Sequence, residues 1–218
     1  MDKIMTGKNK KGYAWYRLLA GFYSSFENIS TGGNNTISQH RAKILQRLQN
    51  YTHHVDLEIV EPQQKPVCKH LTEAIKNGME IWYLPILPAI GHMKKNLKWE
   101  YDYNHLAGNL KEKYAYTEIL GPRGPFVSKN LILGLLLLAP NAEYPKHKHS
   151  GIEKSYLCLS GQVAFNDTGV FSTNTIIYVP PGETHQLTTD NSEPCLLAYA
   201  WLADQKTLKE ASMEWVAE

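Results

Sequence analysis

Three histidines and one carboxylate have residue types and spacings suited to binding a metal ion. His147 and His149 are two residues apart, Glu153 follows shortly after them, and His185 lies downstream. In a β-strand, side chains two residues apart share a face, so the two histidines can converge on one ion while Lys148 points away. Imidazole with one carboxylate suits Fe, Mn, Ni, Cu or Zn better than Ca or Mg. The pattern predicts a metal site formed by His147, His149, Glu153 and His185.

A turn sequence precedes His185 and supports this prediction. Pro180, Pro181 and Gly182 stand together just before it, and glycine supplies the positive φ that lets a chain reverse. The reversal would send His185 along the next strand. The other histidines lack such a context, and we expect surface or structural roles for them: His40, His53, His54, His70, His92 and His105.

Composition indicates an ordinary globular protein and excludes some partners. The chain has 218 residues, 43% hydrophobic and 20% charged, and a formal charge of +2, which gives no field for binding nucleic acid. Its most apolar segment, 131–140, is far shorter than the roughly 20 residues that cross a bilayer, so we expect no membrane span but a strand buried on both faces. Three cysteines without regular spacing argue against a disulfide framework and favour a reducing cytoplasm.

The chain changes texture near residue 97. Before it, 13–26, 38–51 and 65–78 have helical patterns, with Ser38 as the expected N-cap of the second. After it, short runs rich in Tyr, Leu, Ile and Val alternate with Gly, Pro and Asn, the pattern of a β-sandwich or barrel. We therefore predict a mainly β protein, with a helical extension over 1–96 packed on a barrel over 97–218. The predicted strands are 98–103, 114–120, 131–138, 143–149, 154–159, 162–166, 169–172, 175–179, 184–189 and 195–202, and the predicted C-terminal helix is 206–216.

The predicted ligands form two motifs that resemble those of the cupin superfamily. The first is His147-x-His149-x3-Glu153 followed by Gly161, and the second is Pro180-x-Gly182-x2-His185. The run 144–149, the segment 118–122 and the helical extension are similar to the bacterial cupin-type dimethylsulfoniopropionate (DMSP) lyases, over about residues 97–202. The resemblance implies a cupin double-stranded β-helix, a jelly-roll barrel with the metal inside its mouth.

The same resemblance implies an activity and a cofactor. DMSP would be cleaved by β-elimination to acrylate and dimethyl sulfide, with one divalent Fe, Mn, Zn or Ni ion at the substrate carboxylate and a tyrosine as the base. That tyrosine needs its pKa lowered from the unperturbed value of about 10. Aromatic faces attract a dimethylsulfonium cation, so Tyr144, Tyr156, Tyr199 or Trp201 could contact it. A small carboxylate is then the expected partner, and the N-terminal helices could support a homodimer.

One position departs from the lyase pattern. Those lyases have a tyrosine two residues after the ligand Glu, where this chain has Ser155, and Tyr156 stands one residue later. Such a slip turns a side chain to the opposite face of a strand. Seven residues separate Glu153 from Gly161 where cupins usually have six, so a β-bulge near Lys154–Ser155 could return Tyr156 to the inner face. Tyr156 is therefore one candidate base and Tyr144 the other.

Two other functions are compatible with the same residues. An Fe- or Mn-dependent dioxygenase or isomerase would use the same ligands on the same fold. A cupin that binds a metal or small ligand without catalysis would explain the displaced tyrosine. Dependence on dioxygen separates the first from elimination, and loss of turnover on replacing Tyr144 and Tyr156 separates an enzyme from a binding protein.

Overall fold

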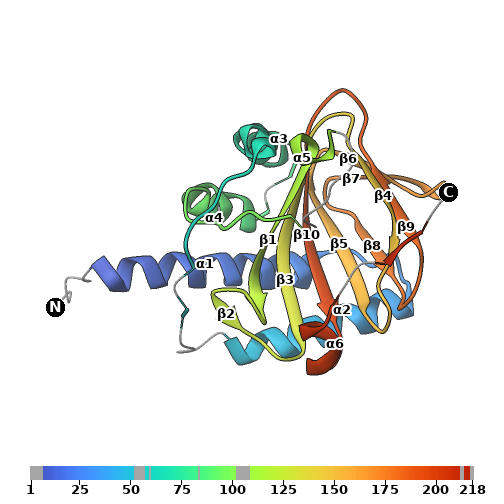
Figure 1. Cartoon of the computed structure of the whole chain (residues 1–218). Helices are drawn as coiled ribbons and strands as arrows, with labels where there is room; N and C mark the ends of the chain where they lie inside the picture. The colour runs from blue at the N-terminus through green and yellow to red at the C-terminus, as the bar shows by residue number, and fades with distance from the viewer. Residues whose placement is uncertain are drawn as a thin grey trace.

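Two β-sheets and a layer of helices make up the computed structural model of the protein (Figure 1). The structure describes residues 7–51, 57–58, 60–82, 84–101, 109–211 and 214–216. The helices lie on one side of the larger sheet, and the smaller sheet lies on the other side (Figure 1). No helix of the described part is long and apolar enough to cross a membrane.

The strand order is that of a jelly roll. The larger sheet runs β2 (Phe126–Val127), β1 (Tyr114–Gly121), β3 (Leu131–Leu138), β10 (Cys195–Leu202), β5 (Glu153–Ser160) and β8 (Ile176–Val179). The smaller sheet runs β11 (Glu214–Trp215), β4 (Glu143–Lys148), β9 (His185–Thr188), β6 (Gln162–Phe165) and β7 (Gly169–Ser172). The chain alternates between the two sheets from β3 to β6 and again from β7 to β10, with the hairpin β6–β7 in the smaller sheet. This arrangement confirms the predicted cupin double-stranded β-helix.

Strand β3 explains why the larger sheet is apolar on both faces. All eight of its residues are buried, as its unbroken apolar run predicts. Leu133, Leu135 and Leu137 face the helices, whereas Ile132 and Leu136 face the interior between the sheets. Gly134 also faces the interior, where a Cβ atom would overlap the phenol ring of Tyr199. The glycine therefore leaves space for a side chain of the interior site.

The helices cover the outer face of the larger sheet. They are α1 (Gly7–Asn28), α2 (Asn35–Leu48), α3 (Leu71–Ile81) and α4 (Ile86–Met93), with 3-10 turns η1 (Gln49–Tyr51) and η2 (Pro66–His70). The short α5 (Leu110–Lys113) instead contacts β1 and β4, and its Leu110 packs in the interior between the sheets. Phe22, Ile44 and Leu87 join the leucines of β3 in one apolar core. Since that core is continuous, the helical layer stabilises the sheet that carries the site.

Some element boundaries differ from the sequence prediction. Helix α2 begins at Asn35, because the Asn34 side chain, not Ser38, caps it by accepting a hydrogen bond from Ile37 N at 3.1 Å. Helix α4 was not predicted, since its sequence contains Pro88. That proline lies in the first turn, where no backbone N–H is needed.

The ends of the predicted barrel differ as well. Residues 98–101 form only isolated bridges, including Glu100 with Tyr116, and the rest of the strand predicted at 98–103 lies outside the described residues. The C-terminal helix is shorter than predicted: α6 spans Gln205–Lys209, and the chain then adds β11 beside β4. Pairing of Trp215 with His147 gives the chain end a place next to the predicted metal ligands.

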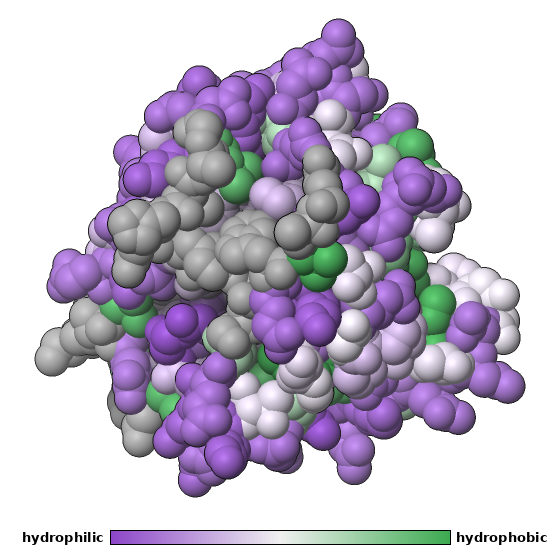
Figure 2. All heavy atoms as spheres, turned by 45° about the vertical axis from the view of Figure 1, so that its right-hand side comes forward, coloured by the Kyte–Doolittle hydropathy of each residue, from purple (hydrophilic) through white to green (hydrophobic). Residues whose placement is uncertain are grey.

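Polar residues dominate the face that Figure 2 shows, and hydrophobic residues there form small separate groups. Scattered groups of this kind are ordinary for a globular protein. The apolar residues with chemical interest are therefore those of the interior, between the sheets.

Candidate active site

Three predicted ligands meet at one end of the barrel interior. His147 lies near the C-terminal end of β4, His149 directly follows that strand, and His185 is the first residue of β9. The centroid of the His147 ring lies 4.1 Å from that of His185 and 5.2 Å from that of His149. The centroids of the His149 and His185 rings are 6.1 Å apart. All three side chains are buried. The structure brings them together because β4 and β9 pair with His147 opposite His185.

Backbone carbonyls orient two of these imidazoles. His147 Nδ1 donates a hydrogen bond to Pro145 O at 2.8 Å, and His185 Nδ1 donates to Glu183 O at 3.1 Å. A carbonyl only accepts, so in each ring Nε2 carries the lone pair. Burial, followed by the positive charge of Lys154, lowers the pKa of His147 to about 3 and also lowers the pKa of His185. Both rings are therefore neutral near pH 7, the form that binds metals.

The three imidazoles suit a transition metal in chemistry, and two of their three separations suit one in spacing. With a metal–nitrogen bond of about 2.1 Å, rings that share one ion have centres roughly 5 Å apart, close to the separations here. Within the part of the chain that the structure describes, no group of three or more His, Cys, Asp or Glu residues is already arranged around an ion position. The ammonium of Lys154 lies 2.9 Å from His185 Nε2. Binding of an ion would therefore require Lys154 to shift.

Glu153, predicted as the fourth ligand, lies on the opposite face of β5. Its Oε1 is 3.0 Å from His40 Nδ1 and accepts a hydrogen bond from the Tyr178 hydroxyl at 3.3 Å. Its Oε2 accepts a hydrogen bond from Lys43 Nζ at 3.0 Å. His40 and Lys43 belong to α2, outside the barrel. The structure thus places Glu153 with the helical layer and not with the three histidines.

The register of β5 is the reason for this difference. Lys154 pairs with Trp201 and Tyr156 with Tyr199 in an unbroken ladder, so the bulge predicted near Lys154–Ser155 is absent. The ladder shifts instead at Leu159, between the partners of Cys158 and Ser160. Lys154 and Tyr156 therefore face the interior, while Glu153 and Ser155 face outward. Tyr156 lies on the inner face, one of the two alternatives that the sequence left open, and it does so by regular alternation without a bulge.

Lys154 is the interior residue that the sequence prediction missed. It is 2% exposed, and its Nζ lies 4.7 Å from the ring centre of Tyr156 and 5.2 Å from that of Trp201. One signal was available, because six residues separate Lys154 from Gly161, which is the usual cupin spacing for the ligand carboxylate. Lysine is not a common metal ligand, so a search for His and carboxylate spacing does not find it.

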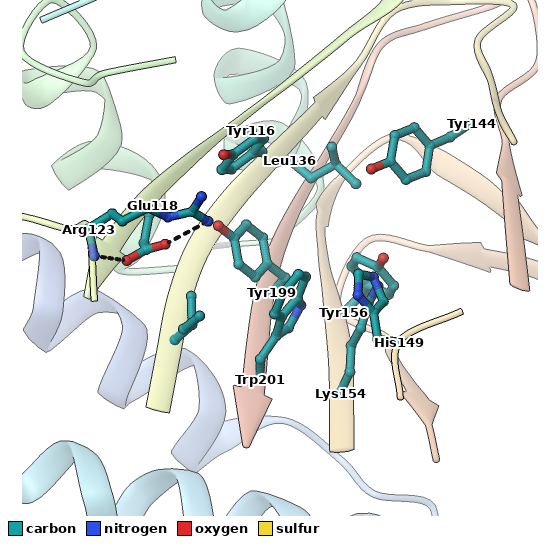
Figure 3. A pocket seen from close by; sticks show the side chains of 11 residues that line it. Tyr116, Glu118, Arg123, Leu136, Tyr144, His149, Lys154, Tyr156, Tyr199 and Trp201 are labelled. Atoms are coloured by element: carbon teal, nitrogen blue, oxygen red, sulfur yellow. Dashed lines mark hydrogen bonds and ion pairs between the residues drawn. The ribbon is translucent and has the colours of Figure 1, made fainter. Parts of the chain in front are cut away.

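The aromatic candidates border the same cavity (Figure 3). The Tyr156 hydroxyl lies 3.4 Å from His185 Nε2, and the Tyr144 ring meets the His147 ring edge-on with centroids 5.0 Å apart. Trp201 lies 4.5 Å from the ring of His149. The cavity is lined by Tyr116, Glu118, Arg123, Ile132, Leu136, Tyr144, His149, Lys154, Tyr156, Tyr199 and Trp201.

A carboxylate and a guanidinium also line this cavity, on the side away from His149 and Tyr156 (Figure 3). Glu118 accepts a hydrogen bond from Arg123 N at 2.7 Å, and its other oxygen lies 3.5 Å from Arg123 Nη2. Burial raises the pKa of the Glu118 carboxyl. Glu118 belongs to the segment 118–122 that resembles the lyases, but no spacing in the sequence marks Glu118 and Arg123 as a pair.

The remaining histidines lie outside the cavity. His40 is buried between α2 and β5, His70 lies in η2, and His92 is exposed on α4. His53, His54 and His105 lie outside the described residues. No other described histidine therefore competes with His147, His149 and His185 for the site.

The fold and the interior site define a cupin with three histidines clustered beside an aromatic-lined cavity, and comparison with known proteins gives its family. A family model for dimethylsulfoniopropionate lyase matches residues 37–197. A protein of Cereibacter sphaeroides that carries the name dimethylsulfoniopropionate lyase DddL is 36% identical over 201 residues, which cover 92% of this chain and 87% of that protein. The chain belongs to the DMSP lyase family, as its motifs predicted, and is a lyase.

Solved structures agree on the fold. A chain from crystal structures of the DMSP lyases RdDddP and RnDddQII superimposes with a TM-score of 0.70 at 19% identity, covering 94% of this chain and 99% of that one. DMSP lyase DddQ from Ruegeria pomeroyi gives a TM-score of 0.68 at 18% identity, with coverage of 94% and 96%. The match spans both the helical layer and the sheets.

Proposed function

We propose that this protein cleaves DMSP by β-elimination to acrylate and dimethyl sulfide in the cavity beside its three clustered histidines. The observation that carries the proposal is the placement of the Tyr156 hydroxyl 3.4 Å from His185 Nε2, in a chain of the DMSP lyase family. A basic oxygen beside a metal-binding group is what removal of a proton next to a carboxylate requires.

The proposed metal ligands are His147, His149 and His185. Their neutral imidazoles suit Fe, Mn, Ni or Zn, and the choice among these stays open. When bound, such an ion supplies Lewis-acid stabilisation of the charge that develops beside the substrate carboxylate. Glu153 is left out of the proposed set because His40 and Lys43 hold it outside the barrel.

Tyr156 is the proposed base. As the phenolate, its oxygen accepts the proton from the carbon next to the carboxylate and becomes the phenol, the electron pair of that C–H bond forms the new double bond, and the C–S bond breaks. Dimethyl sulfide leaves with the electrons of the C–S bond, so the sulfonium charge is neutralised. Tyr144 is the second candidate, since its ring contacts His147 at the cavity wall.

Aromatic rings are proposed to bind the sulfonium end. Tyr199 and Trp201 lie 5.8 Å apart, ring centre to ring centre, and both line the cavity. The face of an aromatic ring attracts a cation, and more strongly where water is excluded. Tyr199 is buried and Trp201 is partly buried, which favours this end of the cavity for a group that is apolar and positively charged.

The other functions considered from the sequence are less well supported. Membership of a lyase family favours elimination over oxygen activation, isomerisation or binding without turnover. A cytoplasmic location and a homodimer formed through the N-terminal helices remain proposals from the sequence.

The test is to load the protein separately with Fe(II), Mn(II), Ni(II) and Zn(II) and to measure headspace dimethyl sulfide and acrylate from DMSP. We expect equal release of both products with at least one metal and its loss in His185→Ala. His92→Ala is the matched control, since His92 is exposed on α4, and it should retain full activity. No release with any metal, by a protein that binds the ion tightly, would refute the proposal.

A further inference from the structure

The structure places a lysine where the cupin motif has its ligand carboxylate. Lys154 lies on the inner face of β5, opposite Trp201 in the strand ladder, and its side chain is almost fully buried. Its ammonium lies 2.9 Å from His185 Nε2, in the region that an ion bound by the histidines would occupy or border. The interior therefore carries a positive group at the position where a carboxylate would neutralise an ion.

This exchange changes the electrostatics of the site. Replacing a carboxylate by an ammonium raises the local charge by two units, from −1 to +1. Among the residues that the structure describes, Glu153 pairs with His40 and Lys43 on the outer face, and Glu118 pairs with Arg123 across the cavity. A buried positive charge at a cavity wall favours an anionic ligand, because an ion pair there is only weakly screened by water.

We propose that Lys154 is a substrate-binding residue that pairs with the carboxylate of the substrate, in addition to the metal. This inference rests on the proposed function for the identity of the substrate. The ring centres of Tyr156 and Trp201 lie 4.7 and 5.2 Å from the Lys154 ammonium. A modest shift of the Lys154 side chain therefore keeps its ammonium next to the same two rings. The carboxylate would then be held beside Tyr156, with its neighbouring carbon next to the phenol oxygen.

A consequence concerns the product. Elimination leaves the carboxylate intact in acrylate, so the group that anchors the substrate also holds the product. The site should therefore bind small monocarboxylates in general, and acrylate should compete with DMSP. Neutral isosteres such as propionamide should bind much more weakly, since they carry no negative charge and cannot form an ion pair with an ammonium.

The experiment measures binding of propionate and propionamide by calorimetry to zinc-loaded wild type, Lys154→Met and Lys154→Gln, with zinc content determined for each. We expect propionate binding to weaken at least about tenfold in both variants, with propionamide binding unchanged. In a protein that turns over DMSP, KM should rise by a similar factor, and the acrylate inhibition constant with it. Lys148→Met is the matched control, because Lys148 pairs with Glu214 at the surface, and it should bind propionate as the wild type does.

Propionate binding as tight in both Lys154 variants as in the wild type would overturn the inference. The readout is separate from catalysis. A wild type that binds propionate through Lys154 but releases no dimethyl sulfide would refute the proposed function while supporting the carboxylate site.

Discussion

The two faces of β5 carry different chemistry although their residues alternate along one strand. Outward, Glu153 and Ser155 contact α2, with Ser155 Oγ 2.9 Å from His40 Nε2 and Glu153 3.0 Å from His40 Nδ1. Inward, Lys154 and Tyr156 line the cavity beside His185. The outer face is a structural contact between layers, whereas the inner face can bind and react. The difference shows that the register of this strand, and not the residue types alone, decides which side chains take part in chemistry.

His40 joins the two outward residues and so favours the observed register. A slip by one residue would bring Glu153 and Ser155 inside and turn Lys154 toward α2. Burial lowers the pKa of His40, against the opposing effect of Glu153, so the ring is suited to accept from Ser155 while facing the carboxylate. The contact between α2 and β5 therefore helps to set the composition of the site.

The largest expected effect is on the inner face. Tyr156→Phe should lower kcat for dimethyl sulfide release by about a thousandfold, since a general base contributes roughly 10²–10⁴-fold. Steady-state kinetics on the metal-loaded protein measures it. Tyr13→Phe is the control, because Tyr13 is 56% exposed. If Tyr144→Phe, and not Tyr156→Phe, removes activity, then Tyr144 is the base and the inward position of Tyr156 has no catalytic meaning.

A charge reversal on the inner face sharpens the comparison. Lys154→Glu would place a carboxylate among the three histidines and should raise zinc affinity at least about tenfold, since even indirect partners of metal ligands change affinity by about 10–100-fold. Competition with a chelator measures the change. Unchanged or weaker zinc binding in a folded variant would mean that the side chain at position 154 does not face the histidines.

A substitution on the outer face of β5 should lower the stability of the protein and leave its metal affinity unchanged. Glu153→Gln removes the carboxylate that faces His40 and Lys43 and should lower the free energy of unfolding by about 2 kcal/mol, with zinc affinity unchanged. Urea denaturation and chelator competition on the same preparation give both quantities. A loss of zinc affinity without a loss of stability would place Glu153 among the ligands after all.

The smallest expected effect concerns the exposed end of the outer contact. The Lys43 side chain is 50% exposed, so Lys43→Met should change the free energy of unfolding by less than about 1 kcal/mol. Urea denaturation at low and high salt measures it, and added salt should shrink the difference from the wild type. An effect as large as that of Glu153→Gln would mean that the Lys43 pair, and not His40, dominates the contact.

The sequence predicted the fold well where local chemistry determines it. The leucine run of β3 shows its burial directly, and the Pro-Pro-Gly turn before β9 holds Gly182 at φ 77°. Helix α4 and strand β11 were missed. The proline of α4 suggests a break, and β11 depends on pairing with β4, which is remote in sequence.

The site was predicted in part. The two-residue spacing placed His147 and His149 together, and the turn placed His185 near them. The facing of Glu153 was not predictable, because it depends on where the ladder of β5 shifts and on a partner, His40, that lies 115 residues from Ser155. The alternation of side chains along a strand determines which residues share a face, but only tertiary contacts decide which face points to the interior.

The most direct test of the account is kcat for dimethyl sulfide release by Glu153→Gln, measured beside His185→Ala on protein loaded with the same metal below the temperature at which either variant unfolds. The account predicts near wild-type kcat for Glu153→Gln and loss of activity for His185→Ala, because His185 lies beside Lys154 and Tyr156 in the interior, whereas Glu153 is held by His40 and Lys43 on the outer face of β5. An equal loss in both variants would contradict it and return Glu153 to the metal site.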